Sequence, residues 1–402
     1  MVAYHESPSQ LPPMLHEGIS LARDGFRVEA LCLAAGDGRG GTETLAPGFT
    51  ARRLPIRTRR FFHALLGRGN ARGPLAVAQW ALTYVEYVAK ALGAALASGA
   101  DCYEAHDLPP LLPAVLAAKL RRKPVVYRAH ELWPETHARV RLAWFWRLLD
   151  RVLVPRCDEV VTPDEGRSTI YLAELGARRP PLTVRNCPPW RPAIESTSLR
   201  DELARRGVHA STIVLYQGLI DSMRCIEELA EASRRFDEGV VLVLLGSGSG
   251  RWADPATALA GYARIVALPR VDYPQVARHT ASAHVGVLLY RNDCRNNYLC
   301  APNKLFEYMM MGLPVVAPSF PGMRALVEGG DVGLCVDPAD PGEIAAAVNR
   351  IAREPGARAR MRANGLRLSR ERYNWEVESA PLLARHRALA GLAAPPRAAP
   401  AA

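Results

Sequence analysis

The segment 301–318, APNKLFEYMMMGLPVVAP, places a lysine and a glutamate on one short helical stretch. Pro302 suits the first turn of a helix, and Gly312 suits the left-handed residue that ends one. Lys304 and Glu307 are three positions apart and therefore share a face. Free N–H groups at the helix N-terminus, together with Lys304, would attract a diphosphate, and Glu307 could accept hydrogen bonds from two ribose hydroxyls. The alternative is an ordinary surface ion pair, and the spacing alone does not decide between them.

The rest of the chain supplies elements that could position this helix. Apolar runs such as VVLVLLG (240–246) and LPVVAP (313–318) alternate with helical segments along both halves. This alternation predicts an α/β fold with parallel sheets covered on both faces. A chain of 402 residues is too long for one core, and the proline-rich stretch 187–198 reads as a linker. We therefore expect two doubly wound, Rossmann-like domains that face a central cleft, where ligands meet the carboxyl ends of the strands.

The composition describes a globular chain, with 49% hydrophobic and 23% charged residues. No run of about 18 apolar residues is present, and the first residues lack the pattern of a signal peptide, so we expect a cytoplasmic protein. The eight cysteines lie singly without a C-x-x-C pair, which argues against zinc. The net charge of +11 would attract nucleic acid, anionic membranes or phosphorylated substrates.

The segment from Gly36 to Gly73 is rich in glycine and arginine and is expected to be irregular, and its basic residues are concentrated between Arg52 and Arg72. Phe61 and Phe62 lie among these arginines. The stretch is either a solvated loop or a patch that binds an anionic membrane. In the second case the protein would be peripheral on the inner face of the membrane. Nucleic-acid binding is not expected, because no recognised motif accompanies the charge.

The motif at 301–318 resembles the NKLFEYM-type segment of the retaining glycosyltransferases with two Rossmann-like domains, in particular the large family four. Segments 102–135, 161–189 and 215–232 also resemble that family, in the same order along the chain. The resemblance implies the GT-B fold, with an acceptor-side domain at 1–190 and a nucleotide-sugar-binding domain at 191–372. A C-terminal helix at 373–391 would cross back to the first domain, and 392–402 would be a disordered tail.

The resemblance also implies roles for particular residues. Glu307 would bind the donor ribose, and Gly218 and Arg224 would lie against the diphosphate. Arg224 and Lys304 would also stabilise charge on the departing diphosphate. The N-terminus of the motif helix would hold the diphosphate through backbone N–H groups of Asn303, Lys304, Leu305 and Phe306.

On the acceptor side, the resemblance places His106 beside the transferred sugar, at the end of an apolar strand. His130 and Glu131 resemble acceptor-side residues of related enzymes, and Asp107 is expected to cap the following helix. The implied reaction is transfer of a sugar from a UDP or GDP donor to a carbohydrate or lipid-linked acceptor, with retention. No metal and no further cofactor are expected, because no D-x-D motif stands in the first domain.

The chain departs from the family pattern at three places. Leu219 occupies the first basic position of the second domain, and Leu299 stands where many members have a glutamate eight positions before Glu307. The first loop has prolines where glycines are common. These departures motivate a rival reading as a catalytically altered subunit that binds a sugar nucleotide or a partner. A transferase for a small natural-product acceptor is a further alternative, and an epimerase or phosphorylase is disfavoured.

Overall fold

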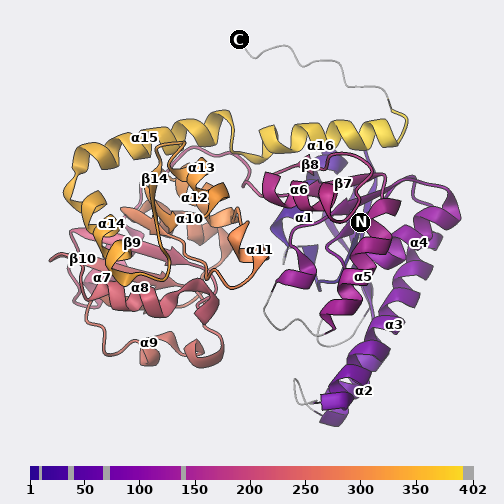
Figure 1. Cartoon of the computed structure of the whole chain (residues 1–402), viewed down its shortest axis with the longest axis horizontal. Helices are drawn as coiled ribbons and strands as arrows, with labels where there is room; N and C mark the ends of the chain where they lie inside the picture. Colours follow the sequence, from indigo (N-terminus) through magenta and orange to yellow (C-terminus); the bar gives the residue numbers. More distant parts are fainter. Residues whose placement is uncertain (9–10, 35–39, 67–72, 137–141, 393–402) are drawn as a thin grey trace. The chain divides into compact units, whose positions relative to one another are not determined.

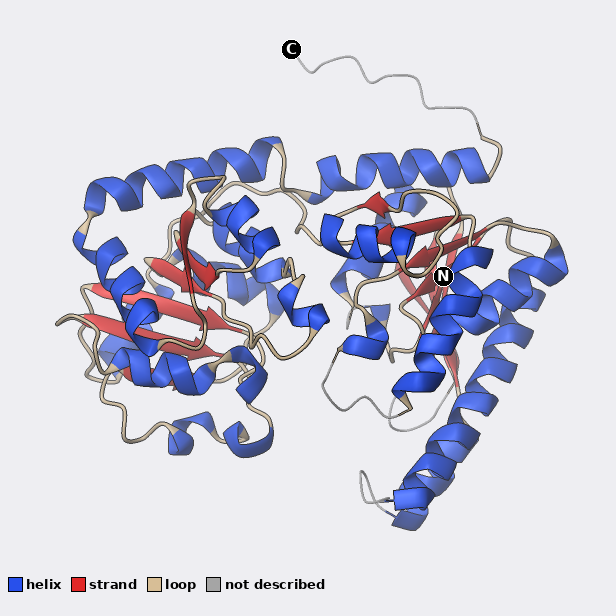
Figure 2. Ribbon diagram, in the orientation of Figure 1, coloured by secondary structure: helices blue, strands red, loops and turns tan. Residues whose placement is uncertain are grey.

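The computed structural model describes residues 1–8, 11–34, 40–66, 73–136 and 142–392. The chain forms two compact units (Figure 1). Unit 1 contains the described residues up to Pro134, then residues 142–184, and the chain from Ser379 onward. Unit 2 contains Glu135, Thr136 and residues 185–378. Each unit is an α/β structure with its own sheet (Figure 2), as expected from the alternation of apolar strands and helices.

The sheet of unit 1 has eight strands in the order β3-β4-β2-β1-β5-β6-β7-β8. All neighbouring strands are parallel except β3 and β4. The central strands β5, β6 and β7 are buried along their whole length, although each contains a charged or titratable residue beside its apolar ones. The strands are β1 (Val2–Ala3), β2 (Val28–Leu33), β3 (Gly41–Ala46), β4 (Phe49–Leu54), β5 (Tyr103–His106), β6 (Val125–Arg128), β7 (Glu159–Thr162) and β8 (Leu182–Thr183).

Helices connect these strands and cover the sheet. The longest, α3, has 26 residues. Unit 1 contains α1 (Pro12–Arg23), α2 (Arg57–Leu66), α3 (Gly73–Ser98), α4 (Leu111–Arg121), α5 (Ala143–Leu153), α6 (Glu165–Ala173), the 3₁₀ turn η3 (Val154–Arg156) and most of α16 (Trp375–Leu389).

The stretch expected to be an irregular basic loop is instead structured. Residues 41–54 form the hairpin of β3 and β4, and β4 pairs in parallel with β2 from Phe49 to Leu54. Arg57 then opens α2. The prediction was wrong because the buried residues of β4, Phe49, Ala51 and Leu54, are few and separated by arginines. Arg68 and Arg72 lie outside the described residues.

The sheet of unit 2 has six strands in the order β11-β10-β9-β12-β13-β14, and all neighbours are parallel. Apolar side chains cover both faces and make two cores. The edge strand β14 was not predicted, because its short run VGLCV follows two glycines. The strands are β9 (Thr212–Gln217), β10 (Val240–Leu245), β11 (Ile265–Leu268), β12 (Val285–Val287), β13 (Val315–Pro318) and β14 (Gly333–Val336).

Among the helices of unit 2, the candidate helix α12 packs its buried side chains into the core on one face of the sheet. Residues 186–197 carry no helix or strand, as their prolines predict. The helices are α7 (Ser198–Arg205), α8 (Ile226–Ser233), α9 (Pro255–Ala258), α10 (Tyr273–Ala281), α11 (Arg295–Tyr298), α12 (Asn303–Met310), α13 (Pro321–Val327), α14 (Pro341–Arg353) and α15 (Pro355–Glu371), with short 3₁₀ turns that include η4 (Ser222–Arg224).

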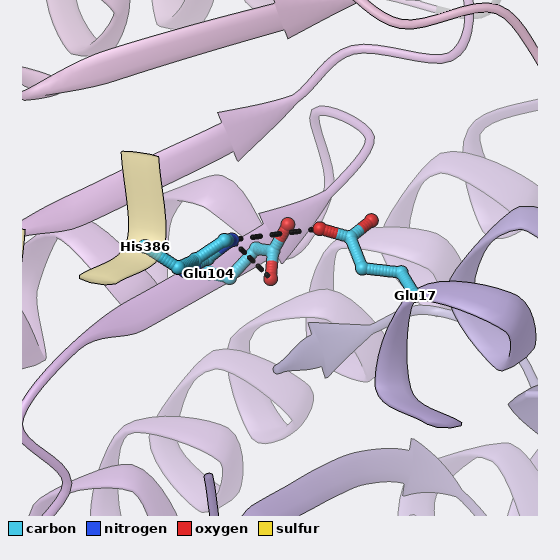
Figure 3. A group of neighbouring side chains, drawn as sticks. All are labelled: Glu17, Glu104 and His386. Atoms are coloured by element: carbon cyan, nitrogen blue, oxygen red, sulfur yellow. Dashed lines mark ion pairs between the residues drawn. The ribbon is translucent and has the colours of Figure 1, made fainter. Parts of the chain in front are cut away.

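Three consecutive residues of α16 bind three different parts of unit 1. Arg385 Nε lies 2.7 Å from Glu159 Oε2 on β7, and Arg387 Nε donates to Asp24 Oδ2 at 2.6 Å, just after α1. Between them, His386 enters the interior. Its Nε2 atom lies 3.5 Å from Glu17 Oε1 and 3.7 Å from Glu104 Oε2 (Figure 3). Ion pairs therefore fix the helix to α1, Asp24 and β7, and the contact of His386 with Glu104 joins it to β5.

The buried carboxylates of Figure 3 do not carry equal charge. Burial raises the pKa of both Glu17 and Glu104, but the guanidinium of Arg128, 3.5 Å from Glu17, holds the pKa of Glu17 below its usual range. Burial and the neighbouring Glu17 leave the pKa of Glu104 well above normal. Glu17 is therefore ionised and Glu104 is protonated. Arg128 and His386 supply the positive charges that face the Glu17 carboxylate.

Candidate functional site

Helix α12 begins with an open N-terminus, as a diphosphate site requires. Pro302 precedes it in an extended conformation, with φ of −75° and ψ of 146°, and no side chain caps the first turn. The N–H groups of the first turn therefore remain free of side-chain caps. The helix ends at the C-cap residue Met311, and Gly312 has φ of +72°, which confirms the predicted left-handed glycine. Leu305 and Phe306 are buried, so only their backbone could meet a ligand.

Lys304 turns toward the end of β9 rather than toward Glu307. Its Nζ atom lies 4.6 Å from the centroid of the Tyr216 ring and 3.4 Å from the Tyr216 hydroxyl. No ion pair joins Lys304 to Glu307 in the part of the chain that the structure describes. Burial, and next the positive charge of Arg224, lower the pKa of Lys304 to about 7, against the attraction of Glu307 and Asp221. A surface ion pair therefore does not explain this lysine.

Arg224 brings a second cation toward the same place. It ends the 3₁₀ turn η4, and its guanidinium carbon lies 4.2 Å from the centroid of the Tyr290 ring. Its Nε atom is buried and has no hydrogen-bond partner among the described residues. Because Arg224 depresses the pKa of Lys304, the two cations are close enough to repel each other. A dianionic group would relieve that repulsion and satisfy both side chains.

Glu307 is held by a chain of hydrogen bonds that starts on α10. The hydroxyl of Thr280 donates to Gln217 Oε1 at 2.8 Å, and Gln217 Nε2 donates to Glu307 Oε2 at 2.6 Å. This fixes the amide orientation of Gln217 and leaves the second carboxylate oxygen of Glu307 for another donor. Burial raises the pKa of Glu307, although Lys304 and the Gln217 hydrogen bond oppose the rise.

Gly218 is the point where the chain passes closest to Lys304. Its φ is +120°, a conformation that side chains rarely adopt. A Cβ atom on Gly218 would lie 2.5 Å from Lys304 Nζ. The glycine therefore permits both the turn after β9 and the close approach of the lysine.

Leu219 and Leu299, the two residues of unit 2 that depart from the family pattern, bring no charged side chain to this site. Leu219 is 44% exposed, next to Gly218, and Leu299 is half-buried at the end of α11. Asn297, two positions before Leu299, donates both amide hydrogens, to Arg291 O at 3.1 Å and to Asp293 Oδ1 at 3.0 Å.

In unit 1, the structure brings His106 and His130 together at the ends of β5 and β6. His106 Nδ1 lies 3.1 Å from His130 Nε2, and the two rings stack with their centroids 5.4 Å apart. His106 is fully buried, and burial lowers its pKa to about 3, so the imidazole is neutral. Burial also places the pKa of His130 well below normal. The role of this pair in an acceptor site stays a prediction.

Asp107 does not cap α4, contrary to the sequence-based expectation. The residue before α4 is Pro110, and the Asp107 carboxylate instead accepts the N–H of His130 at 3.0 Å. Asp107 itself has φ of +70°. Burial, and next the charge of Glu131, raise the pKa of Asp107 to about 8. Glu131 is exposed beside this buried group.

Sequence reasoning missed the residues that hold the charged side chains of α12 and η4. These are Tyr216, Gln217, Thr280 and Tyr290. Gln217 had a usable signal, because it is a polar side chain that ends an apolar strand directly before a glycine. Tyr290 likewise ends the apolar run VGVLLY. Thr280 carries no such signal, since its contact depends on the packing of α10.

Comparison with known proteins places both units in one enzyme family. Residues 18–187 match the family model described as "Glycosyl transferase 4-like domain", and residues 211–354 match "Glycosyl transferases group 1". Two D-inositol 3-phosphate glycosyltransferases are similar in sequence. The one from Xylanimonas cellulosilytica is 29% identical over 48% of this chain and 45% of its own length. The one from Thermomonospora curvata is 33% identical over 39% of this chain and 36% of its own length. The chain thus aligns with less than half the length of these curated relatives.

Solved structures share the fold across almost the whole chain. Sucrose-phosphate synthase from Thermosynechococcus elongatus has a TM-score of 0.75 at 17% identity, over 96% of this chain and 98% of that one. HepE from Anabaena, in complex with UDP-glucose, has a TM-score of 0.65 at 17% identity, with the same coverage. With the two family models covering both halves, the chain belongs to the GT4-like glycosyltransferases and has their GT-B fold.

Proposed function

We propose that this protein transfers a sugar from a nucleoside diphosphate to an acceptor hydroxyl, with retention at the anomeric carbon. The observation that carries the proposal is the position of Lys304 in the uncapped first turn of α12, with its Nζ atom 3.4 Å from the Tyr216 hydroxyl at the end of β9 and the charge of Arg224 acting on it. Two repelling cations and free N–H groups form a site for a diphosphate. Glu307, one turn further along, supplies a carboxylate for ribose hydroxyls. The complex of HepE with UDP-glucose favours a uridine nucleotide over guanosine.

The proposed chemistry needs no protein nucleophile. The bond between the anomeric carbon and the diphosphate oxygen breaks, and the acceptor oxygen bonds to the same face of the sugar. The departing phosphate oxygen takes the acceptor proton. Negative charge therefore grows on the diphosphate, where Lys304 and Arg224 stabilise it. Because these side chains already bring two positive charges, we propose that transfer proceeds without a metal ion.

The acceptor is proposed to be a carbohydrate or a lipid-linked glycan of the cell surface, met by His106, His130 and Glu131 of unit 1. The curated relatives named for D-inositol 3-phosphate support a test of small phosphorylated polyols in the same panel. Incubation with UDP-sugars and these acceptors, followed by NMR of the product, tests the proposal. An α-linked donor should give an α-linked product, and added EDTA should leave the rate unchanged. An inverted product would contradict the proposal.

The second candidate is a sugar-nucleotide-binding subunit without transferase activity. Leu219 and Leu299 favour this second candidate, because neither side chain has a polar atom that could contact phosphate or sugar hydroxyls. Measuring slow hydrolysis of the donor in the absence of acceptor distinguishes the transferase from the non-catalytic subunit. The transferase should release UDP at a measurable rate, whereas the subunit should bind the donor without releasing it.

A further inference from the structure

Exposed apolar side chains of this chain are concentrated on neighbouring helices of unit 1. Helix α4 contacts both α3 and α5, and Figure 1 shows the three grouped in unit 1. The aromatic rings of Trp80 and Tyr84 on α3 pack against Phe145 and Trp146 on α5. Helices α2 to α5 carry ten of the seventeen large apolar side chains that are exposed in the described chain: Phe61, Leu75, Val77, Leu82, Val85, Leu116, Leu120, Trp144, Leu148 and Val152.

Helix α5 shows the arrangement most clearly. Trp146, Asp150 and Leu153 are buried, so the helix already has an inner face. Trp144, Leu148 and Val152 recur every four residues on the outer face, and the first two are 65% and 53% exposed. A soluble helix normally places polar residues there. Leu116 and Leu120 repeat the pattern on the neighbouring α4, where Leu120 is 66% exposed.

The charged residues around this apolar face are positive. Arg147 and Arg151 are exposed on α5, and Lys119 and Arg122 are exposed at the end of α4. None of these four forms an ion pair with another described residue. The acidic side chain of α5, Asp150, is buried, and α4 contains no acidic residue. By contrast, two arginines of the 52–72 segment already have acidic partners, since Arg53 pairs with Glu43 and Arg59 with Glu6.

We propose that the outer face of α4 and α5 binds the surface of an anionic membrane. Leucines and a tryptophan would enter the headgroup region, while the flanking cations would meet lipid phosphates. A second copy of this chain fits poorly, because a two-fold contact would bring the same four cations against one another. Nucleic acid also fits poorly, because four of the five exposed apolar side chains of this face are aliphatic and only Trp144 offers bases a stacking surface. The inference does not depend on the proposed function, although a lipid-linked acceptor would benefit from it.

Cosedimentation with vesicles tests the inference on the full chain. Vesicles containing phosphatidylglycerol in phosphatidylcholine should bind the protein, phosphatidylcholine alone should bind it weakly, and salt should weaken binding. The double variant Trp144→Ser, Leu148→Ser should reduce binding by about tenfold or more. Leu172→Ser with Val377→Ser, which removes two exposed apolar side chains elsewhere, should bind as the unaltered protein does.

The charge contribution has its own pair of variants. Arg147→Glu with Arg151→Glu should abolish the preference for phosphatidylglycerol. Arg367→Glu with Arg370→Glu on α15 changes the net charge equally and should retain it. Unchanged thermal unfolding and unchanged UDP titration of all variants show that folding and the nucleotide site are intact. If the unaltered protein binds no UDP, the proposed function fails while the vesicle result stands.

Two results would overturn the inference. One is the absence of binding to phosphatidylglycerol vesicles, or equal binding by the Trp144→Ser, Leu148→Ser variant. The other is tight binding of a single-stranded oligonucleotide that Arg147→Glu, Arg151→Glu removes, with no vesicle binding, which would make this face a nucleic-acid site.

Discussion

Lys304 Nζ lies over the ring of Tyr216, 4.6 Å from its centroid, and Arg224 adds a second positive charge close by. Burial, and next the positive charge of Arg224, lower the pKa of Lys304 to about 7. The lowered pKa makes nucleotide binding dependent on pH, because a bound diphosphate favours the protonated amine. Above pH 7 the free protein must take up a proton when it binds the ligand. We expect UDP affinity to fall by up to about tenfold per pH unit above 7.

Isothermal titration of UDP between pH 6 and pH 9, in buffers of different ionisation enthalpy, measures this proton uptake directly. The variant Lys304→Met should bind weakly with a flattened pH profile. Lys119→Met, which removes an exposed lysine from α4, should keep the profile of the unaltered protein. A pH-independent affinity in the unaltered protein would show that Lys304 does not meet the phosphate.

Replacing Glu307 tests the ribose contact. Loss of a hydrogen bond to a charged group costs about 1.5–3 kcal/mol, so Glu307→Ala should weaken UDP binding by roughly ten- to a hundredfold. The unaltered protein should bind 2′-deoxy-UDP or 3′-deoxy-UDP less tightly than UDP. Glu307→Ala should lose that discrimination, because the partner of the hydroxyl is gone. Full discrimination by the variant would place the ribose elsewhere.

Gly218 tests the close packing around Lys304. The change Gly218→Ala forces a side chain into φ of +120° and puts a Cβ atom 2.5 Å from Lys304 Nζ. We expect about 1–3 kcal/mol of destabilisation and a clear loss of UDP affinity. Gly207→Ala is the matched control, since φ there is +71° with no atom near the added Cβ. The Gly207→Ala variant should lose stability and keep its affinity for UDP. If Gly218→Ala binds UDP as tightly as the unaltered protein does, Gly218 is not part of the nucleotide site.

His386 makes stability depend on pH in unit 1. Burial opposes its charged form, but Cys102 and Glu17 raise its pKa to about 9, above the ordinary value of 6.5. A raised folded-state pKa means that the stabilisation is fully present below pH 6.5 and is lost as the pH rises through 9. His386→Gln should therefore destabilise the protein at pH 6 and have less effect at pH 9.5. His209→Gln, at an exposed position, should have little effect at either pH.

Thermal unfolding of the unaltered protein and the two variants across this range gives the comparison. Taking the difference between proteins removes the opposite contribution of Lys304, whose lowered pKa favours folding as the pH rises above 7. An effect of His386→Gln that is the same at pH 6 and pH 9.5 would mean that its imidazole is neutral in the folded protein.

Local patterns in the sequence predicted the parts of the fold whose signal is local. The left-handed Gly312 and the two largely parallel sheets follow from spacing and composition. The hairpin at 41–54 was missed, because its pairing with β2 is decided by residues far away in the chain. Asp107 was assigned to a helix cap because the sequence does not show that β6 brings the His130 N–H to it.

The same distinction applies to the candidate site, where residues of one helix were predicted and their partners from distant segments were not. Lys304 and Glu307 were predicted from their spacing on one helix, whereas their partners Tyr216 and Gln217 come from β9, about ninety residues earlier. The group of Glu17, Glu104 and His386 joins three distant segments, and none of them carries a motif. Such contacts depend on how the sheets and helices pack, which a single sequence does not specify.

The central claim is that α12 binds the diphosphate and ribose of a sugar nucleotide. Isothermal titration of the full chain with UDP at pH 6.5 tests it most directly, with GDP as the competing base and Glu307→Ala as the matched variant. We expect saturable binding of UDP at one site, weaker binding of GDP, and a loss of roughly ten- to a hundredfold in the variant. Undetectable binding of UDP and GDP, or UDP affinity that Glu307→Ala leaves unchanged, would contradict it.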